Sequence, residues 1–119
     1  MTTRELLERA KGAKANLALA DTETKNRALL AMADALVGNT QAILTANDLD
    51  LFEAKDTVST VMLDRLALSE ARILSMAQGM REVAALPDPV GAVLRREARP
   101  NGLVIEKTAV PMGVIAIIY

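Results

Sequence analysis

Cysteine, whose thiol can act as a nucleophile, and histidine, the commonest general base, are both absent from the 119 residues. Their absence excludes disulfides and thiol catalysis within this chain and removes a common metal ligand. The three serines, Ser59, Ser69 and Ser75, lie in no nucleophile-elbow motif and have no histidine to activate them. We therefore predict no catalytic residue and no metal-binding residue in this sequence.

Asn47 is the most unusual polar residue in the first half of the chain, because it falls on an apolar helical stripe. A buried amide needs hydrogen-bond partners, and a neighbouring loop backbone is favoured over a substrate as that partner. Asp48 and Asp50 are two residues apart, so on a helix they point away from each other and cannot act as a carboxylate pair. We expect both aspartates to lie in solvent.

Two further groups of charged residues could bind a ligand, but for each group a structural role is favoured over a functional one. Asp64 and Arg65 are adjacent in a short turn, where a local cap or ion pair is favoured over catalysis. Three arginines, Arg95, Arg96 and Arg99, could grip a phosphate, whereas charge on an exposed ribbon edge also prevents aggregation. The second role is favoured, and the dispersed glycines form no phosphate-binding loop.

The overall composition narrows the class of partner. The chain has 14 basic and 15 acidic residues, no tryptophan, and single aromatic residues at Phe52 and Tyr119. A near-neutral charge and few stacking rings argue against a nucleic-acid partner. No run approaches the ~20 apolar residues that span a bilayer, and the N-terminus has no hydrophobic signal core. We expect a cytoplasmic protein with no membrane partner.

Residues 1 to about 86 have the apolar spacing of helices. Thr2 and Glu5 form a capping box for the first helix. The second helix begins near Thr22 and ends at Gly38, because glycine is typical of a helix C-terminus. Thr40 caps the third helix, residues 56–62 are a break, residues 63–66 form a short turn, and Ser69 caps the last helix. The expected apolar faces of the four helices are, in order, Leu6, Ala10, Ala13, Leu17 and Ala20; Leu29, Met32 and Leu36; Ile43, Asn47, Leu51 and Ala54; and Ile73, Met76, Met80 and Val83.

The pattern changes at Pro87-Asp-Pro89, because two prolines in three residues cannot lie inside a helix. Alternation around Leu103 and Ile105 and the Asn101-Gly102 pair predict a two-stranded antiparallel ribbon over residues 90–109. The uncharged run Val114–Ile118 predicts that residues 110–119 form a strand buried on both faces, as in a parallel sheet. The 119 residues contain no partners for such a strand, so we expect a portion of a larger α/β protein.

Five short motifs in this order resemble the N-terminal region of the gamma-glutamyl phosphate reductase family, also called glutamate-5-semialdehyde dehydrogenases, within the aldehyde dehydrogenase superfamily. Each motif alone is weak, but the order and spacing of all five are specific, and the resemblance covers essentially all 119 residues. The motifs are Ala46-Asn-Asp48 with Asp50, Leu63-Asp-Arg-Leu66-Ala-Leu68, Leu86-Pro-Asp-Pro-Val-Gly91, Pro100-Asn-Gly-Leu103, and Val110-Pro-Met-Gly-Val-Ile115 with Ile117-Ile-Tyr119.

The resemblance implies the N-terminal portion of an aldehyde dehydrogenase-like α/β fold. Residues 1–89 would be a helical segment of the cofactor-binding domain, residues 90–109 an oligomerising β-ribbon, and residues 110–119 the first strand of the Rossmann-like cofactor sheet. It further implies a parent enzyme that uses NADPH to reduce gamma-glutamyl phosphate to glutamate-5-semialdehyde in L-proline biosynthesis. In that family a thiolate attacks the acyl phosphate, and this chain departs from the family because it has no cysteine.

By the same resemblance, Ile118 and Tyr119 are the only residues expected at the cofactor, and their role as simple core residues stays open. We expect this 119-residue portion to be inactive, to bind NADP(H) poorly and to form homo-oligomers through the ribbon or the exposed strand. Two alternatives remain: another aldehyde dehydrogenase that acts on a free aldehyde, or a non-catalytic helical interaction module.

Overall fold

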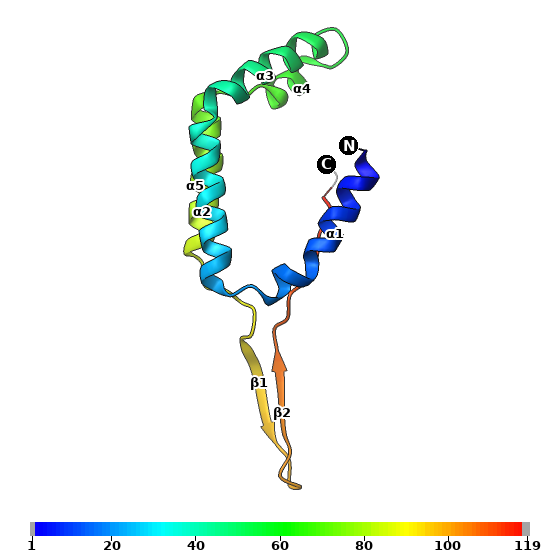
Figure 1. Cartoon of the computed structure of the whole chain (residues 1–119), viewed down its shortest axis with the longest axis vertical. Coiled ribbons are helices and arrows are strands. Elements are labelled where there is room, and N and C mark those ends of the chain that lie inside the picture. The colour runs from blue at the N-terminus through cyan, green and yellow to red at the C-terminus, as the bar shows by residue number, and fades with distance from the viewer. Residues whose placement is uncertain (1, 118–119) are drawn as a thin grey trace. The chain divides into compact units, whose positions relative to one another are not determined.

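The computed structural model describes residues 2–117, which form five helices followed by a two-stranded antiparallel hairpin (Figure 1). The elements are α1 (Thr3–Leu19), α2 (Thr22–Gly38), α3 (Thr40–Ala54), α4 (Thr60–Leu66), α5 (Glu70–Ala85), β1 (Val93–Ala98) and β2 (Val104–Thr108). They divide into two compact units. One is Glu23–Leu86, with most of α2 and all of α3, α4 and α5, and the other holds the described parts of Met1–Thr22 and Pro87–Tyr119.

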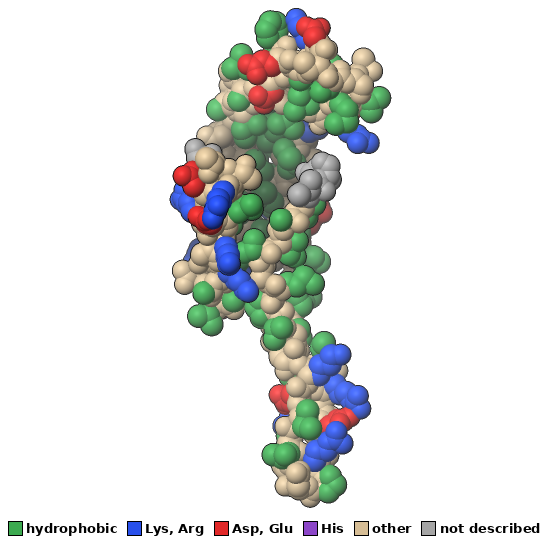
Figure 2. All heavy atoms as spheres, turned by 90° about the vertical axis from the view of Figure 1, so that its right-hand side faces the viewer, with side chains coloured by type: hydrophobic (Ala, Val, Ile, Leu, Met, Phe, Trp, Pro, Cys, Tyr) green, Lys and Arg blue, Asp and Glu red, His purple; other side chains and the backbone are tan. Residues whose placement is uncertain are grey.

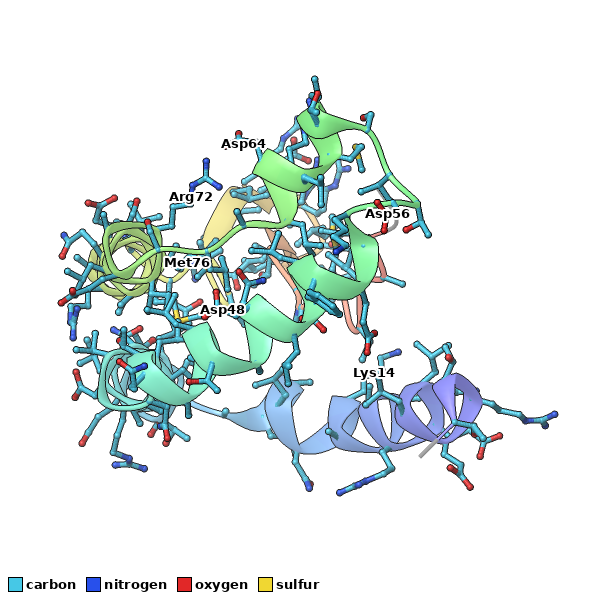
Figure 3. The ribbon with its side chains drawn as sticks, turned by 90° about the horizontal axis from the view of Figure 1, so that it is seen from above. Lys14, Asp48, Asp56, Asp64, Arg72 and Met76 are labelled. Atoms are coloured by element: carbon cyan, nitrogen blue, oxygen red, sulfur yellow. The ribbon has the colours of Figure 1, made fainter. Side chains whose placement is uncertain are left out.

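The helical unit is centred on the contact between α2 and α5, which lie side by side (Figures 1 and 3). Ala33 of α2 and Ile73 and Ala77 of α5 are fully buried. Arg81 of α5 also pairs with Asp34 of α2, with 2.8 Å between Nη2 and Oδ1. Two of the three fully buried apolar side chains are alanines, so the buried core of this unit is small.

The predicted buried faces of α2 and α5 are right at some positions and wrong at others. Ile73 is buried as predicted, and Leu29, Leu36 and Met80 are half-buried. Met32, Met76 and Val83 were expected on the buried faces, but all three are exposed. Ala33 and Ala77, one residue further along each helix, are buried instead. The buried face of each helix therefore lies close to the predicted one, with Ala33 and Ala77 buried in place of the neighbouring methionines. The stripe of α3 is confirmed, with Asn47 buried and Ile43, Leu51 and Ala54 half-buried.

The helix ends agree with the sequence at some positions and differ at others. Ser69 caps α5, since its hydroxyl accepts a hydrogen bond from the Arg72 amide. Ser59 caps α4 in the same way, and α4 occupies residues predicted as a break and a turn. Thr40 was expected to cap α3 but is its first helical residue, and its hydroxyl donates backwards to the Val37 carbonyl at 2.8 Å. Gly38 ends α2 without a positive φ.

In the second unit, α1 begins with the predicted capping box. The Thr2 amide donates to Glu5 Oε2 at 2.7 Å, and the Glu5 amide donates to Thr2 Oγ1 at 3.3 Å. The predicted apolar stripe is only partly covered, because Leu6 and Leu17 are exposed while Ala10, Ala18 and Ala20 are half-buried. The covered face of α1 is therefore the one that carries alanines.

The hairpin confirms the predicted ribbon. Arg96 lies opposite Glu106 and Ala98 opposite Val104, with one extra residue between Val93 and Arg95 that makes a bulge. The Gly102 amide donates to the Arg99 carbonyl and the Arg99 amide to the Leu103 carbonyl, so a three-residue loop lies between Arg99 and Leu103. Gly102 has φ 85°, the left-handed conformation that the third residue of such a loop requires.

The predicted strand over residues 110–119 is absent from the part that the structure describes, since residues 110–117 form no strand. A strand requires a hydrogen-bonded neighbour, and the described sheet contains only β1 and β2, which pair with each other. An uncharged β-branched run supplies the propensity for a strand but not its partner. Gly113, in the middle of this segment, has φ 96°.

Candidate functional site

The most connected polar group in the helical unit surrounds the C-terminus of α4. Asn47 of α3 is 6% exposed, and its Nδ2 donates to the Leu66 carbonyl at 3.0 Å. Its Oδ1 accepts from the Leu68 amide at 2.7 Å. One amide therefore bonds to both sides of Ala67, the residue that joins α4 to the segment before α5. The prediction that Asn47 is buried and bonded to a neighbouring loop backbone is confirmed.

Arg72 of α5 completes the same junction. Its Nη1 donates to the carbonyls of Asp64 and Ala67, and its Nη2 pairs with Asp64 Oδ1 at 3.2 Å. Figure 3 shows Asp64 and Arg72 on the same side of the molecule. The final carbonyls of a helix have no partner within the helix, so Asn47 and Arg72 supply what α4 lacks. We refer to Asn47, Asp64 and Arg72 as the α4 clamp.

The α4 clamp corrects one detail of the sequence analysis. Asp64 does make a local ion pair, as expected, but its partner is Arg72 and not the adjacent Arg65. Arg72 was missed because nothing in a single sequence marks an arginine eight residues away as a partner. A weak signal existed, since Arg72 lies three residues after the capping Ser69 and so points back toward the start of α5. Asp48 and Asp50 are both exposed, as predicted.

The arginines of the ribbon face glutamates. Arg96 Nε lies 3.2 Å from Glu106 Oε1 across the strands, and Arg99 Nη2 lies 3.4 Å from Glu97 Oε2. Arg95 also pairs with Glu97. In Figure 2 their basic side chains gather along the ribbon. Because each arginine already has a carboxylate partner, the structure favours a role for these charges in protecting the exposed ribbon edge from aggregation over a role in binding phosphate.

No described residues converge to form a catalytic or metal site. Among residues 2–117 there is no group of three histidine, cysteine, aspartate or glutamate side chains placed to hold a metal ion. Surface depressions formed by the described residues include one along α2 from Glu23 to Asp34 and one from Gly38 to Leu49. Both are lined by neighbouring turns of α2 or α3, so neither collects the convergent polar groups of an active site.

The two predicted cofactor residues, Ile118 and Tyr119, lie outside the described residues. The segment that leads to them contacts α1 at one point. A β-carbon built on Gly113 would lie 3.0 Å from Cε of Lys14, so the lysine side chain passes directly over this glycine. Lys14 was not singled out by the sequence, where it is one of several exposed charges on α1.

Among residues 2–117, no single helix has both the length and the hydropathy to cross a bilayer. The helices α2 and α3, which are bent by 68° at the break between them, are long and apolar enough to do so only when they are taken together.

Comparison with known proteins gives consistent results in sequence and in structure. No model of a known protein family matches the chain. Gamma-glutamyl phosphate reductase of Streptococcus pneumoniae (strain Hungary19A-6) is 53% identical over all 119 residues, and the same values hold for strain D39. The chain spans 28% of the length of these curated relatives.

Two crystal structures of gamma-glutamyl phosphate reductases have a similar fold. The Thermotoga maritima structure matches 90% of this chain and 27% of its own length, with a TM-score of 0.83 and 38% identity. The Saccharomyces cerevisiae structure matches 93% of this chain and 29% of its own length, with a TM-score of 0.82 and 32% identity. The five helices and the hairpin match the N-terminal part of these structures. The chain is therefore a homologue of the gamma-glutamyl phosphate reductases over about 28% of their length.

Proposed function

We propose that this chain forms the N-terminal scaffold of a gamma-glutamyl phosphate reductase, which reduces gamma-glutamyl phosphate to glutamate-5-semialdehyde with NADPH in L-proline biosynthesis. The observation that carries the proposal is 53% identity over every residue of the chain. The relatives described above all bear this enzyme's name. They favour this reaction over the two alternatives, a free-aldehyde dehydrogenase and a non-catalytic interaction module.

In this proposal the three parts of the chain have separate roles. Residues 1–89 support the cofactor-binding domain, residues 90–109 form a ribbon that joins copies of the enzyme, and residues 110–119 form the first strand of the cofactor sheet. Ile118 and Tyr119, at the end of that strand, would contact the cofactor. The observed order of helices and hairpin supports this division. The enzyme would act in the cytoplasm.

The chain contributes position and not reactive groups to the proposed reaction. NADPH, when bound, supplies the hydride. A mechanism with a thioester intermediate needs a cysteine, and the 119 residues contain none. What the described residues do is hold elements in place: the α4 clamp fixes α4 against α3 and α5. The contact between Lys14 and Gly113 joins α1 to the segment before the cofactor residues.

A chimeric enzyme tests the proposal. The matching N-terminal segment of the Streptococcus pneumoniae relative is replaced by these 119 residues, and the purified chimera is assayed for NADP⁺-dependent oxidation of the semialdehyde in the presence of phosphate. We expect kcat/KM within about tenfold of the unaltered relative, a loss of at most about 1.4 kcal/mol of transition-state stabilisation. The relative lacking its N-terminal segment is the inactive control. A chimera that folds and assembles normally but has no turnover contradicts the proposal.

A further inference from the structure

The side chain of Lys14 lies across the backbone at Gly113. A β-carbon added to Gly113 would be 3.0 Å from Lys14 Cε, 3.5 Å from Nζ and 3.6 Å from Cδ. The nearest atoms therefore include two methylenes of the lysine stem. Gly113 also has φ 96°, a conformation that residues with a side chain rarely adopt. The backbone conformation favours glycine at this point, and an added β-carbon would also displace the end of the Lys14 side chain by a few tenths of an ångström.

The surrounding burial shows that this is the contact point between the two segments. Of residues 110–117, Gly113 alone is half-buried and the others are exposed. On α1, Ala10 and Ala18 are half-buried, and they lie four residues before and after Lys14. Residues four apart share a helix face, so one face of α1 carries Ala10, Lys14 and Ala18. Figure 3 shows Lys14 extending from α1.

We propose that Lys14 is a positioning residue, whose aliphatic stem holds the Gly113 backbone against α1 and so sets the direction in which residues 114–117 leave that helix. A lysine stem can cover apolar surface while its ammonium group reaches water. The stem therefore does the holding and the charge is not required. The consequence for the cofactor rests on the proposed function, in which this segment leads to Ile118 and Tyr119.

The first test uses the 119-residue chain alone and does not depend on its function. Lys14→Ala removes the stem, Lys14→Met keeps an apolar stem without the charge, and Lys11→Ala removes an exposed lysine elsewhere on α1. We expect lower NMR order parameters for the backbone amides of residues 112–117 in Lys14→Ala than in the unaltered chain. Lys14→Met and Lys11→Ala should leave these order parameters unchanged, and the order parameters of α1 should be the same in all variants.

The second test places the same substitutions in the chimeric enzyme. Lys14→Ala should raise the KM for NADP⁺ by about tenfold, equivalent to about 1.4 kcal/mol, with kcat and the KM for the semialdehyde little changed. Lys14→Met should restore the KM, and Lys11→Ala should not alter it. Gly113→Ala should raise the KM as well. The double variant should lose less cofactor-binding free energy than the two single variants lose together, because the two residues share one contact.

The outcomes separate this inference from the proposed function. An unaltered chimera without activity contradicts the proposed function, while lower order parameters of residues 112–117 in Lys14→Ala would still support the positioning role in the isolated chain. An active chimera whose Lys14→Ala variant behaves like Lys11→Ala overturns the inference alone. If Lys14→Met is as damaging as Lys14→Ala, the ammonium group matters and the stem mechanism is wrong.

Discussion

At the scale of single residues, Asn47 illustrates how one side chain can fix the path of a whole segment. Its amide has one donor and one acceptor directed at the backbone on either side of Ala67. An amide suits this place because it donates from one atom and accepts at another, whereas a carboxylate cannot donate and an ammonium group cannot accept. The identity of the residue at this buried position thus follows from the hydrogen bonds that it makes.

Asn47→Ala should destabilise the chain by about 2–3 kcal/mol, because it leaves the Leu66 carbonyl and the Leu68 amide unpaired in a half-buried place. Asn47→Asp should also destabilise it, since a carboxylate would face the Leu66 carbonyl. Urea unfolding followed by circular dichroism measures both effects. Asp48→Ala, on the exposed side of the same helix, is the control and should change the free energy of unfolding by less than about 0.5 kcal/mol. Equal effects of Asn47→Ala and Asp48→Ala would show that the amide bonds do not stabilise the fold.

The sequence predicted the burial and the type of partner of Asn47 but not the complete α4 clamp. Burial follows from position on an apolar stripe, and a buried amide always needs partners. The role of Arg72 depends on how α4 and α5 are oriented at their junction, and that orientation comes from tertiary packing. Hydrogen bonds between residues distant in sequence leave no local pattern, so Arg72 could not have been identified from spacing alone.

At the scale of elements, the presence of the helices and of the ribbon could be predicted from the spacing of apolar residues, the capping residues and the turn residues. The Thr2–Glu5 capping box, the Ser69 cap and the Asn101-Gly102 turn are local signals, and all three are present in the structure. Which face of a helix is buried was predicted less well, because Met32 and Val83 are as apolar as the alanines that pack instead. The choice depends on the partner helix, which a single amphipathic pattern does not contain.

Two glycine substitutions should change stability in opposite directions. Gly102 has φ 85° in the hairpin loop, with open space around it, so Gly102→Ala should cost about 1–2 kcal/mol from backbone strain alone. Gly12 lies inside α1, also with open space, and Gly12→Ala should stabilise the chain by about 0.4–1 kcal/mol. Thermal unfolding compares the two variants. Gly102→Asn, which tolerates a left-handed backbone, should cost less than Gly102→Ala. A neutral Gly102→Ala would mean that the loop does not keep this conformation.

At the scale of the whole molecule, the described residues leave many large apolar side chains exposed. Val110, Met112, Val114, Ile115 and Ile117 are exposed in the final segment. Full burial of such a side chain is worth about 1.5–3 kcal/mol, so covering several of them contributes several kcal/mol of favourable free energy to association with a partner. The similarity to a much longer enzyme is consistent with surfaces that other parts of that enzyme would cover.

The isolated chain should therefore self-associate at about 100 μM, a concentration at which exposed apolar segments promote aggregation. Light scattering measures the association. Replacing both Ile115 and Ile117 with lysine should reduce it if the final segment is responsible. Leu19→Lys, at an exposed apolar position on α1, tests for non-specific hydrophobic association and should reduce the association less. A stable monomer of the unmodified chain would contradict this expectation and favour a self-contained module.

The most direct test of the central claim uses the 119-residue chain itself. The Streptococcus pneumoniae relative is produced without the segment that this chain matches, and is then refolded together with the separate chain. We predict phosphate-dependent reduction of NADP⁺ by the semialdehyde when both pieces are present, and none with either piece alone. The relative's own N-terminal segment, added as a separate piece, is the matched control. If that segment restores turnover and this chain does not, the account of the chain as a reductase scaffold is wrong.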